Sequence, residues 1–465
     1  MTITGTCIID EAEIEKTLSR SRKPSLAHAR EILTKARELR GLAFEDVAAL
    51  MNIKDPELKY EMFVTARWVK EQIYGNRLVL FAPLYVSNYC SNSCLYCGYR
   101  CENTELGRRM LSLDEIADEV RFLVMHGHKR ILMLAGETPE KDTLRYMVDA
   151  IATIYKTRVG NGEIRRVNIN VAPLSVDGFK TLKASHIGTY QLFQETYCRR
   201  MYAKLHPRGP KADYDWRVTA MHRAMEAGID DVGIGPLLGL YDWHFEVLAL
   251  MQHIQSLEKE FGVGVHTISI PRLEPAVGSE YATNSPSLVS DDDFLKLVAI
   301  LRLAVPYTGM IMSTRERPEI RDATFRLGIS QISAGSRVDP GGYVNGSGDP
   351  QKEQFVLGDH RSIEEVIQDI VRMGFIPSFC TACYRLGRTG GDFMDLAKPG
   401  EIKYHCTPNA LSTFQEYLID YASPQTRAVG EQMIRTTLDQ MDQRQRRLSD
   451  GLLCQVKAGG RDIYL

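Results

Sequence analysis

Six of the ten cysteines in this 465-residue chain fall into two tight groups. The groups are Cys90, Cys94 and Cys97, spaced C-x3-C-x2-C, and Cys380, Cys383 and Cys406, spaced C-x2-C-x22-C. In a chain with so few cysteines, such grouping favours metal or redox chemistry over disulfides. Three thiolates on one loop can hold three irons of a [4Fe–4S] cluster and leave the fourth iron open. An open iron is a Lewis acid that can chelate a ligand carrying an amine and a carboxylate.

Structural zinc is the alternative for both groups. Structural zinc sites use four protein ligands, and the first loop offers no fourth, although a histidine could come from elsewhere in the chain. For the second group His405 is available as a fourth ligand, so the residues alone suit zinc about as well as a cluster. The other four cysteines are isolated and are interpreted as plain side chains: Cys7, Cys101, Cys198 and Cys454.

Eight short apolar runs predict the strands that position these loops. They cover residues 78–87, 130–136, 166–172, 189–195, 231–238, 266–272, 309–315 and 331–336. Continuous apolar runs are typical of parallel strands covered on both faces, and most of the intervals allow a crossover helix. Eight such units over roughly 260 residues match the size of a (β/α)8 barrel. We therefore predict an α/β fold built on a TIM-type barrel, with a doubly wound open sheet as the alternative.

Helix signals flank these strands. Ser112, Ser290 and Ser362 are each followed three residues later by an acidic side chain, which predicts a capped helix start. Apolar residues recur at helical spacing through the first 76 residues. A Gly- and Pro-rich stretch begins at 339, and a mostly helical region with a polar tail at 424–448 follows it. The expected domains are an N-terminal helical extension (1–76), the barrel (77–338) and a C-terminal, mostly helical domain (339–465).

Composition and charge exclude several classes of protein. The 57 Lys and Arg nearly balance 59 Asp and Glu, for a net charge of −2, which argues against a dedicated nucleic-acid binder. No apolar stretch is long enough to span a membrane, and the N-terminus lacks the pattern of a secretory signal. We therefore expect a cytoplasmic protein that binds neither nucleic acid nor membrane.

Polar and small residues follow several of the expected strands. The second strand ends in Gly136 and Glu137, where a glycine lets the backbone approach a ligand and a carboxylate can receive an ammonium. The fourth ends with Gln194 and Glu195, which could hydrogen-bond a ribose or order a substrate. The alternative to ligand binding is that these residues form simple turns or serve tight packing.

The fifth, sixth and seventh strands add further candidates. Gly233-Ile234 in the fifth could let an adenine lie against the backbone, although helix packing explains small residues equally well. The sixth places His266 and Ser269 where an apolar run would otherwise stand, although a lone histidine is more often a core residue. The seventh ends in Ser313, Thr314 and Arg315, and the fork of an arginine suits a carboxylate. An Arg–Glu ion pair is the alternative there.

The first cysteine loop resembles the signature of the radical S-adenosylmethionine (SAM) superfamily, with aromatic Tyr96 directly before the third cysteine. Gly136-Glu137 resembles that family's Gly-Gly-Glu element, with Ala135 in place of the first glycine. The resemblance implies that the open iron binds SAM and that one electron cleaves SAM to a 5′-deoxyadenosyl radical. It also implies that Tyr96, Gly136, Glu137, the Gln194-Glu195 pair and the Gly233-Ile234 pair contact the cofactor.

The stretches 193–197, 233–240 and 313–316 resemble the tyrosine lyase branch of that superfamily. Thiamine-biosynthesis lyases of this branch lack the second cysteine group, which instead resembles the second cluster site of the tyrosine-cleaving [FeFe]-hydrogenase maturases. That resemblance implies cleavage of the Cα–Cβ bond of L-tyrosine to p-cresol and dehydroglycine, which becomes carbon monoxide and cyanide on iron. It also implies that Arg315 with Ser313 or Thr314 binds the tyrosine carboxylate, with Ser269 in support.

The same resemblance implies the cofactors and partners. They are two [4Fe–4S] clusters, one binding SAM and one auxiliary with an extra labile iron, and His266 holds that iron. Cysteine is an expected iron ligand, ferredoxin or flavodoxin an expected reductant, and other hydrogenase maturation proteins the expected partners. A lyase that makes dehydroglycine only, and a non-catalytic iron–sulfur carrier, are the two alternatives. A carrier has no use for polar residues at the strand ends.

Overall fold

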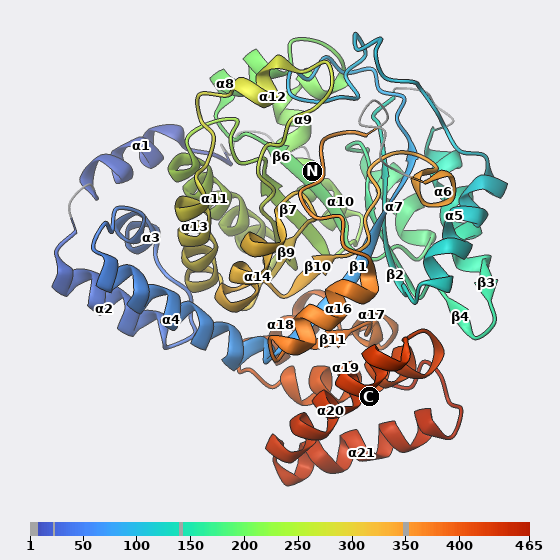
Figure 1. The fold of residues 1–465 in the computed structure, drawn as a ribbon. Helices are drawn as coiled ribbons and strands as arrows, with labels where there is room; N and C mark the ends of the chain where they lie inside the picture. Colours follow the sequence, from blue (N-terminus) through green and yellow to red (C-terminus); the bar gives the residue numbers. More distant parts are fainter. Residues whose placement is uncertain (1–7, 22–23, 139–142, 347–352) are drawn as a thin grey trace.

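A computed structural model describes residues 8–21, 24–138, 143–346 and 353–465 (Figure 1). The N-terminal region is helical, as expected, and comprises α1 (Glu11–Arg20), α2 (Leu26–Ala36), α3 (Phe44–Met51) and α4 (Pro56–Tyr74). These helices pack on the outer side of the barrel helices α11 (Trp243–Phe261) and α13 (Asp291–Ala304). They therefore support one side of the barrel, and Tyr74 at the end of α4 also reaches the second cavity described below.

Eight parallel strands form a closed barrel. They are β1 (Arg77–Ser87), β2 (Arg130–Ala135), β5 (Arg166–Asn170), β6 (Tyr190–Glu195), β7 (Val232–Pro236), β8 (Thr267–Ser269), β9 (Gly309–Met312) and β10 (Gln331–Ser333). Closure comes from the pairing of β10 with β1, in which Val79 faces Gln331. The predicted barrel is thus confirmed, and the open-sheet alternative is wrong.

Helices surround the barrel and connect its strands. They include α5 (Leu113–Met125), α6 (Thr143–Lys156), α7 (Val176–Ala184), α10 (Ala220–Glu226), α11, α13 and α14 (Pro318–Leu327). The capping box predicted at Ser112 is present, with Glu115 reaching back to the Ser112 backbone. Short helices α8 (Arg199–Leu205), η1 (Pro210–Ala212), α9 (Tyr214–Val218) and α12 (Glu280–Asn284) occupy the loops near the carboxyl ends of the strands. A small hairpin, β3 (Arg158–Val159) and β4 (Gly162–Glu163), was not predicted.

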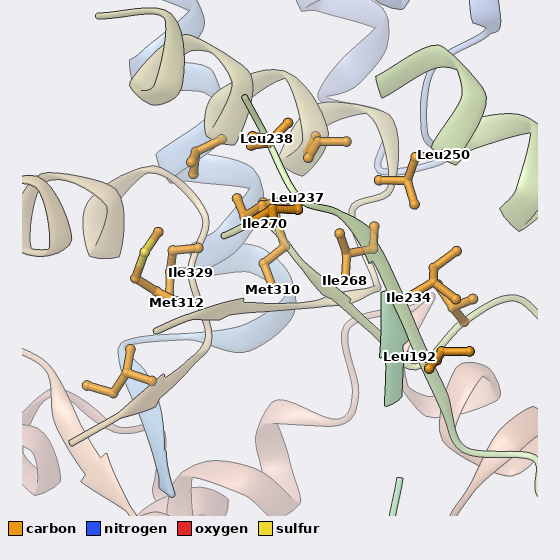
Figure 2. Packing of buried hydrophobic residues seen from close by; sticks show 14 of the residues in the cluster. Leu192, Ile234, Leu237, Leu238, Leu250, Ile268, Ile270, Met310, Met312 and Ile329 are labelled. Atoms are coloured by element: carbon orange, nitrogen blue, oxygen red, sulfur yellow. The ribbon is translucent and has the colours of Figure 1, made fainter. Parts of the chain in front are cut away.

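The hydrophobic core lies between the barrel and its helices. Ile234, Ile268 and Met310 from β7, β8 and β9 gather with Leu250 of α11 (Figure 2). Because side chains alternate along a strand, their neighbours face the barrel interior instead. This alternation separates an oily outer layer from an inner bore that is lined by smaller and more polar residues.

The C-terminal region closes one end of the barrel. It contains α15 (Gly342–Asn345), α16 (Ile363–Arg372), β11 (Ile376–Ser378), α17 (Ala382–Arg385), α18 (Gly390–Ala397) and α19 (Lys403–Asp420). Strand β11 pairs in parallel with the start of β1, so that Arg77 faces Ile376. The predicted polar tail is two helices, α20 (Pro424–Gln440) and α21 (Gln443–Lys457), because Asp442 caps a new helix start. None of the described helices is long and apolar enough to cross a membrane.

Candidate active site

A cavity of about 200 Å³ lies at the carboxyl ends of the barrel strands and is called the upper cavity below. Its wall includes the first cysteine triad together with residues from seven of the barrel strands. Of the residues predicted from sequence, those that line it are Cys90, Cys94, Cys97, Tyr96, Gly136, Glu137, Glu195, Ser269, Ser313, Thr314 and Arg315. Carboxyl ends of barrel strands are where TIM-barrel enzymes place their active sites.

The first cysteine loop is fixed by main-chain hydrogen bonds on both sides. The Ser91 amide donates to the Glu137 carbonyl (2.8 Å), and the Leu95 amide donates to the Leu205 carbonyl (3.0 Å). Gly136 lies so close to the start of this loop that a Cβ atom built on it would stand 2.1 Å from the Tyr89 carbonyl oxygen. Only glycine permits this approach, which explains the glycine of the Gly136-Glu137 pair in physical terms.

The sulfur atoms of the first triad receive hydrogen-bond donors and suit a cluster. The Tyr99 amide (3.4 Å) and Gln354 Nε2 (3.7 Å) point at the Cys97 Sγ, and Asn92 Nδ2 points at the Cys90 Sγ (3.7 Å). Donors directed at sulfur are typical of iron–sulfur sites, where they tune the cluster potential.

Burial opposes these hydrogen bonds in its effect on the thiol pKa. It raises the pKa of Cys94 and Cys97, so their thiolates need the positive charge that iron supplies. No group of three or more Cys, His, Asp or Glu among the described residues is arranged around a single metal ion. A cubane makes a different demand, because each thiolate binds a different iron atom.

A buried ion network stands beside the triad. Lys211 Nζ donates to Glu195 Oε1 (2.5 Å), and Arg217 lies 3.4 Å from Glu195 and 3.6 Å from Glu137. Burial alone would raise the pKa of Glu195, but the charges of Lys211 and Arg217 hold it below its ordinary value. Glu195 also adopts a left-handed φ of 72°, where the β6–β7 register shifts. Such strain is typical of functional positions that the surroundings over-determine.

Arg315 forms the opposite wall. Its guanidinium carbon lies 3.2 Å from the centre of the Phe355 ring, and no carboxylate among the described residues forms an ion pair with it. Burial lowers the pKa of Arg315 below its ordinary value, and Glu274, also in the wall, has a pKa raised to about 7 by burial and by Glu316. A buried cation without an internal partner fits an anionic ligand group.

Three predicted cofactor contacts do not line the upper cavity: Gln194, Gly233 and Ile234. Gln194 is the one residue of 191–195 that does not line it, and its side chain is buried. Ile234 lies in the outer core with Leu192 and Ile268 (Figure 2). Gly233 faces the bore, where a Cβ atom would stand 2.4 Å from the Thr267 hydroxyl. The side chains of Gln194 and Ile234 thus do not reach the upper cavity, whereas the contact predicted for Gly233-Ile234 was with the backbone and stays a prediction.

The second triad lies at the opposite end of the barrel. Cys380 follows β11, Cys383 lies on α17 and Cys406 on the first turn of α19. A side-chain hydrogen bond joins Cys383 to Cys406, raising the pKa of Cys383 and lowering that of Cys406 to about 6. All three line a second cavity of about 60 Å³, called the lower cavity below, and the Ala382 amide donates to the Cys380 Sγ (3.4 Å). His405, the alternative zinc ligand, does not line it.

His266 lines the lower cavity with the second triad. Its Nδ1 lies 2.8 Å from Asp231 Oδ1, and its Nε2 lies 3.4 Å from the Tyr384 hydroxyl. Burial opposes ionisation of Asp231, but His266 and Arg166 lower its pKa below the ordinary value. A carboxylate on one ring nitrogen orients the other nitrogen toward a metal. This is the end of the barrel where the sequence predicted His266 to lie.

A thin apolar layer separates the two cavities inside the bore. Phe81, Leu132 and Ile311 form this layer and line the upper cavity. The residues two positions earlier on the same strands and on β10 line the lower cavity: Val79, Arg130, Gly309 and Gln331. Strand β1 runs from one site to the other, roughly 27 Å along the barrel axis for eleven tilted residues.

Sequence reasoning missed the cationic and second-layer residues of both sites. Lys211 lies in η1 and Arg217 in α9, two short helices after β6 where no strand-end pattern marks them. Arg130 begins β2 and Asp231 precedes β7, at strand starts rather than strand ends. A search for isolated charges inside apolar runs could have found Arg130.

Comparisons with known proteins agree with this geometry. The family model of the radical SAM superfamily matches residues 84–251, and that of the Biotin and Thiamin Synthesis associated domain matches residues 269–376. The 2-iminoacetate synthase of Salmonella typhimurium is 30% identical over 337 residues, which cover 72% of this chain and 86% of that protein.

Two solved structures match over nearly the whole chain. A crystal structure of HydG, a maturase of the [FeFe]-hydrogenase, is 49% identical with a TM-score of 0.95, over 98% of this chain and 100% of that chain. The HydG maturase of Carboxydothermus hydrogenoformans is 40% identical with a TM-score of 0.83, over 95% of this chain and 98% of that chain. This chain is a radical SAM enzyme and belongs to the HydG family of [FeFe]-hydrogenase maturases.

Proposed function

We propose that the chain cleaves L-tyrosine to p-cresol and dehydroglycine in the upper cavity and converts dehydroglycine to carbon monoxide and cyanide in the lower one. The Salmonella relative is named for 2-iminoacetate, another name of dehydroglycine, and the two similar structures are maturases. The products would supply an iron–carbonyl–cyanide unit for assembly of the hydrogenase active site. The single observation that carries the proposal is the placement of two cysteine triads on two cavities at opposite ends of one barrel.

The first triad would hold a [4Fe–4S] cluster, and SAM bound there supplies a 5′-deoxyadenosyl radical when the cluster is reduced. Glu137 is available to bind the amino group of SAM. Glu195, Lys211 and Arg217 are available to bind other polar groups of SAM. The Arg315 fork would bind the tyrosine carboxylate, with Ser313, Thr314 or Ser269 in support. The enclosed cavity shields radical chemistry from solvent.

The second triad would hold an auxiliary [4Fe–4S] cluster, with His266 as a ligand of an extra labile iron and cysteine completing it. The conversion there balances without an oxidant or reductant: HN=CH–COO⁻ gives CN⁻, CO and H2O. Asp231 would hold His266 in the orientation that presents Nε2 to the iron. The expected reductant of the first site is a ferredoxin or flavodoxin, and other maturation proteins are the expected acceptors.

Substitution of Cys383 by alanine tests the division of labour. We expect p-cresol to form at the wild-type rate, because the upper cavity is intact, and carbon monoxide to fall below detection. Cys454→Ala is the matched control, since Cys454 is exposed on α21 and lines neither cavity. Gas and p-cresol are measured in the same anaerobic reaction.

The result separates the proposal from its alternative. Unchanged carbon monoxide in Cys383→Ala would return the chain to the thiamine-type lyase, which makes dehydroglycine only. Absence of both SAM cleavage and p-cresol in the wild-type holoenzyme would instead favour an iron–sulfur carrier.

A further inference from the structure

Arg130 lines the lower cavity directly below the apolar layer that separates the two cavities. We propose that it binds the carboxylate of dehydroglycine as this fragment enters the lower cavity, an inference that rests on the proposed function. Arg130 lines the lower cavity, and Leu132, two residues later on the same face of β2, lines the upper one. A fragment that passes the apolar layer therefore meets Arg130 next.

The hydrogen bonds of Arg130 leave donors free. Its Nη1 donates to Gln331 Oε1 (3.2 Å), and its Nη2 donates to the Cys380 carbonyl (3.0 Å). Both acceptors are neutral, and its Nε is buried with no partner. No carboxylate among the described residues forms an ion pair with Arg130. Arginine has five N–H donors, and a buried guanidinium without an anion is costly.

The surroundings of Arg130 suit a small carboxylate. Arg130 is only 5% exposed, so an anionic partner for its guanidinium has to lie inside the lower cavity. Gly309, in the same inner layer, has no side chain to fill the space beside Gln331. The fork of Arg130 can donate two parallel hydrogen bonds to the fragment's oxygens while His266 and the second triad line the same space.

Arg77 is the competing cation in the lower cavity. It lies two residues before Val79 on β1, one layer farther from the upper cavity than Arg130. Burial lowers the pKa of Arg77, but the Cys406 thiolate and its neighbours raise it overall. Arg77 thus interacts electrostatically with all three thiols of the second triad, whereas Arg130 acts on Cys380 alone among them and lies next to the apolar layer.

The test compares Arg130→Gln, Arg130→Lys and Arg77→Gln in the reconstituted holoenzyme. For Arg130→Gln we expect p-cresol within about twofold of wild type and carbon monoxide and cyanide reduced about 100-fold, the loss typical of an unpaired buried charge partner. Dehydroglycine then escapes and hydrolyses, HN=CH–COO⁻ with H2O giving glyoxylate and ammonia, so glyoxylate should accumulate in step with p-cresol. Arg130→Lys keeps the charge and should recover part of the carbon monoxide.

A second readout is competition by a stable carboxylate. Glyoxylate, a stable carboxylate of the same size, should inhibit carbon monoxide release by wild type without slowing p-cresol formation. The glyoxylate concentration needed for the same inhibition should be about 100-fold higher in Arg130→Lys. Wild-type carbon monoxide in Arg130→Gln overturns the proposal.

Iron analysis distinguishes the remaining outcomes. Iron, sulfide and the paramagnetic signal of the second cluster should be unchanged in Arg130→Gln. If they are lost to the same extent as in Arg77→Gln, Arg130 is a counter-ion of the triad, and this result also overturns the proposal. Failure of wild type to release carbon monoxide would refute the proposed function itself, which is a separate result.

Discussion

Replacing Gly136 with alanine perturbs the contact between strand β2 and the first cysteine loop. The added Cβ atom would stand 2.1 Å from the Tyr89 oxygen and 2.8 Å from the Tyr89 carbonyl carbon. Opening the first contact to only 3.0 Å requires a displacement of 0.9 Å. The loop cannot yield freely, because main-chain hydrogen bonds join Gly136 to Ser87 and Ser91 to Glu137.

The displacement falls on the residue that precedes Cys90. A misplacement of about 1 Å in an active site costs about 100-fold in rate, and overpacking costs about 1–3 kcal/mol of stability. We therefore expect p-cresol formation by Gly136→Ala to fall about 100-fold and SAM binding to weaken, with the iron content of the second site unchanged. The assays are p-cresol yield, SAM titration, iron per chain and equilibrium unfolding.

Gly264→Ala is the matched control, since a Cβ atom there meets nothing closer than Ile254 at 3.6 Å. That variant should keep both activities and lose little stability. Wild-type p-cresol and SAM affinity in Gly136→Ala would refute the claim that this close approach positions the cysteine loop. Equal loss of iron from both sites would show general misfolding, and would refute it as well.

Two further predictions concern buried charges. Arg315→Met should raise the tyrosine concentration needed for half-maximal p-cresol formation about 100-fold while SAM affinity is kept, since a buried guanidinium–carboxylate contact is lost; unchanged tyrosine dependence would remove Arg315 from the site. Burial raises the pKa of Glu246 from an ordinary 4.5 to about 8, so stability from this group is full below pH 4.5 and is lost as the pH rises toward 8. The free energy of unfolding of Glu246→Gln, relative to that of wild type, should therefore rise across that window by several kcal/mol, at about 1.4 kcal/mol per pKa unit. Unfolding curves at pH 5, 6.5 and 8 measure this difference, and parallel pH profiles would contradict it.

The sequence predicted the elements whose signals are local. All eight strands and the cysteine triads lie where spacing and apolar runs placed them, because a buried parallel strand must be apolar and a loop at its end is exposed to ligand. The capped helix starts at Ser112 and Ser362 also form as expected, because a capping box depends on residues only three positions apart.

Residues whose place depends on three-dimensional detail were harder to predict. Gln194 and Glu195 are adjacent in sequence, yet only Glu195 lines the upper cavity, because alternation along β6 and the register shift beyond Phe193 decide which side chain turns inward. Lys211 and Arg217 reach the site from the short helices η1 and α9, and their contacts follow only from the folded path of the chain. The left-handed conformation of Glu195 has no signal in the residue type.

The pairing of β11 with the first residues of β1 has a mechanical consequence. The three residues of β11 extend the same sheet that carries the first cysteine loop, so main-chain pairing fixes the start of the second cysteine region to the barrel. On the proposed function, side chains inside the bore would then decide what passes between the two cavities.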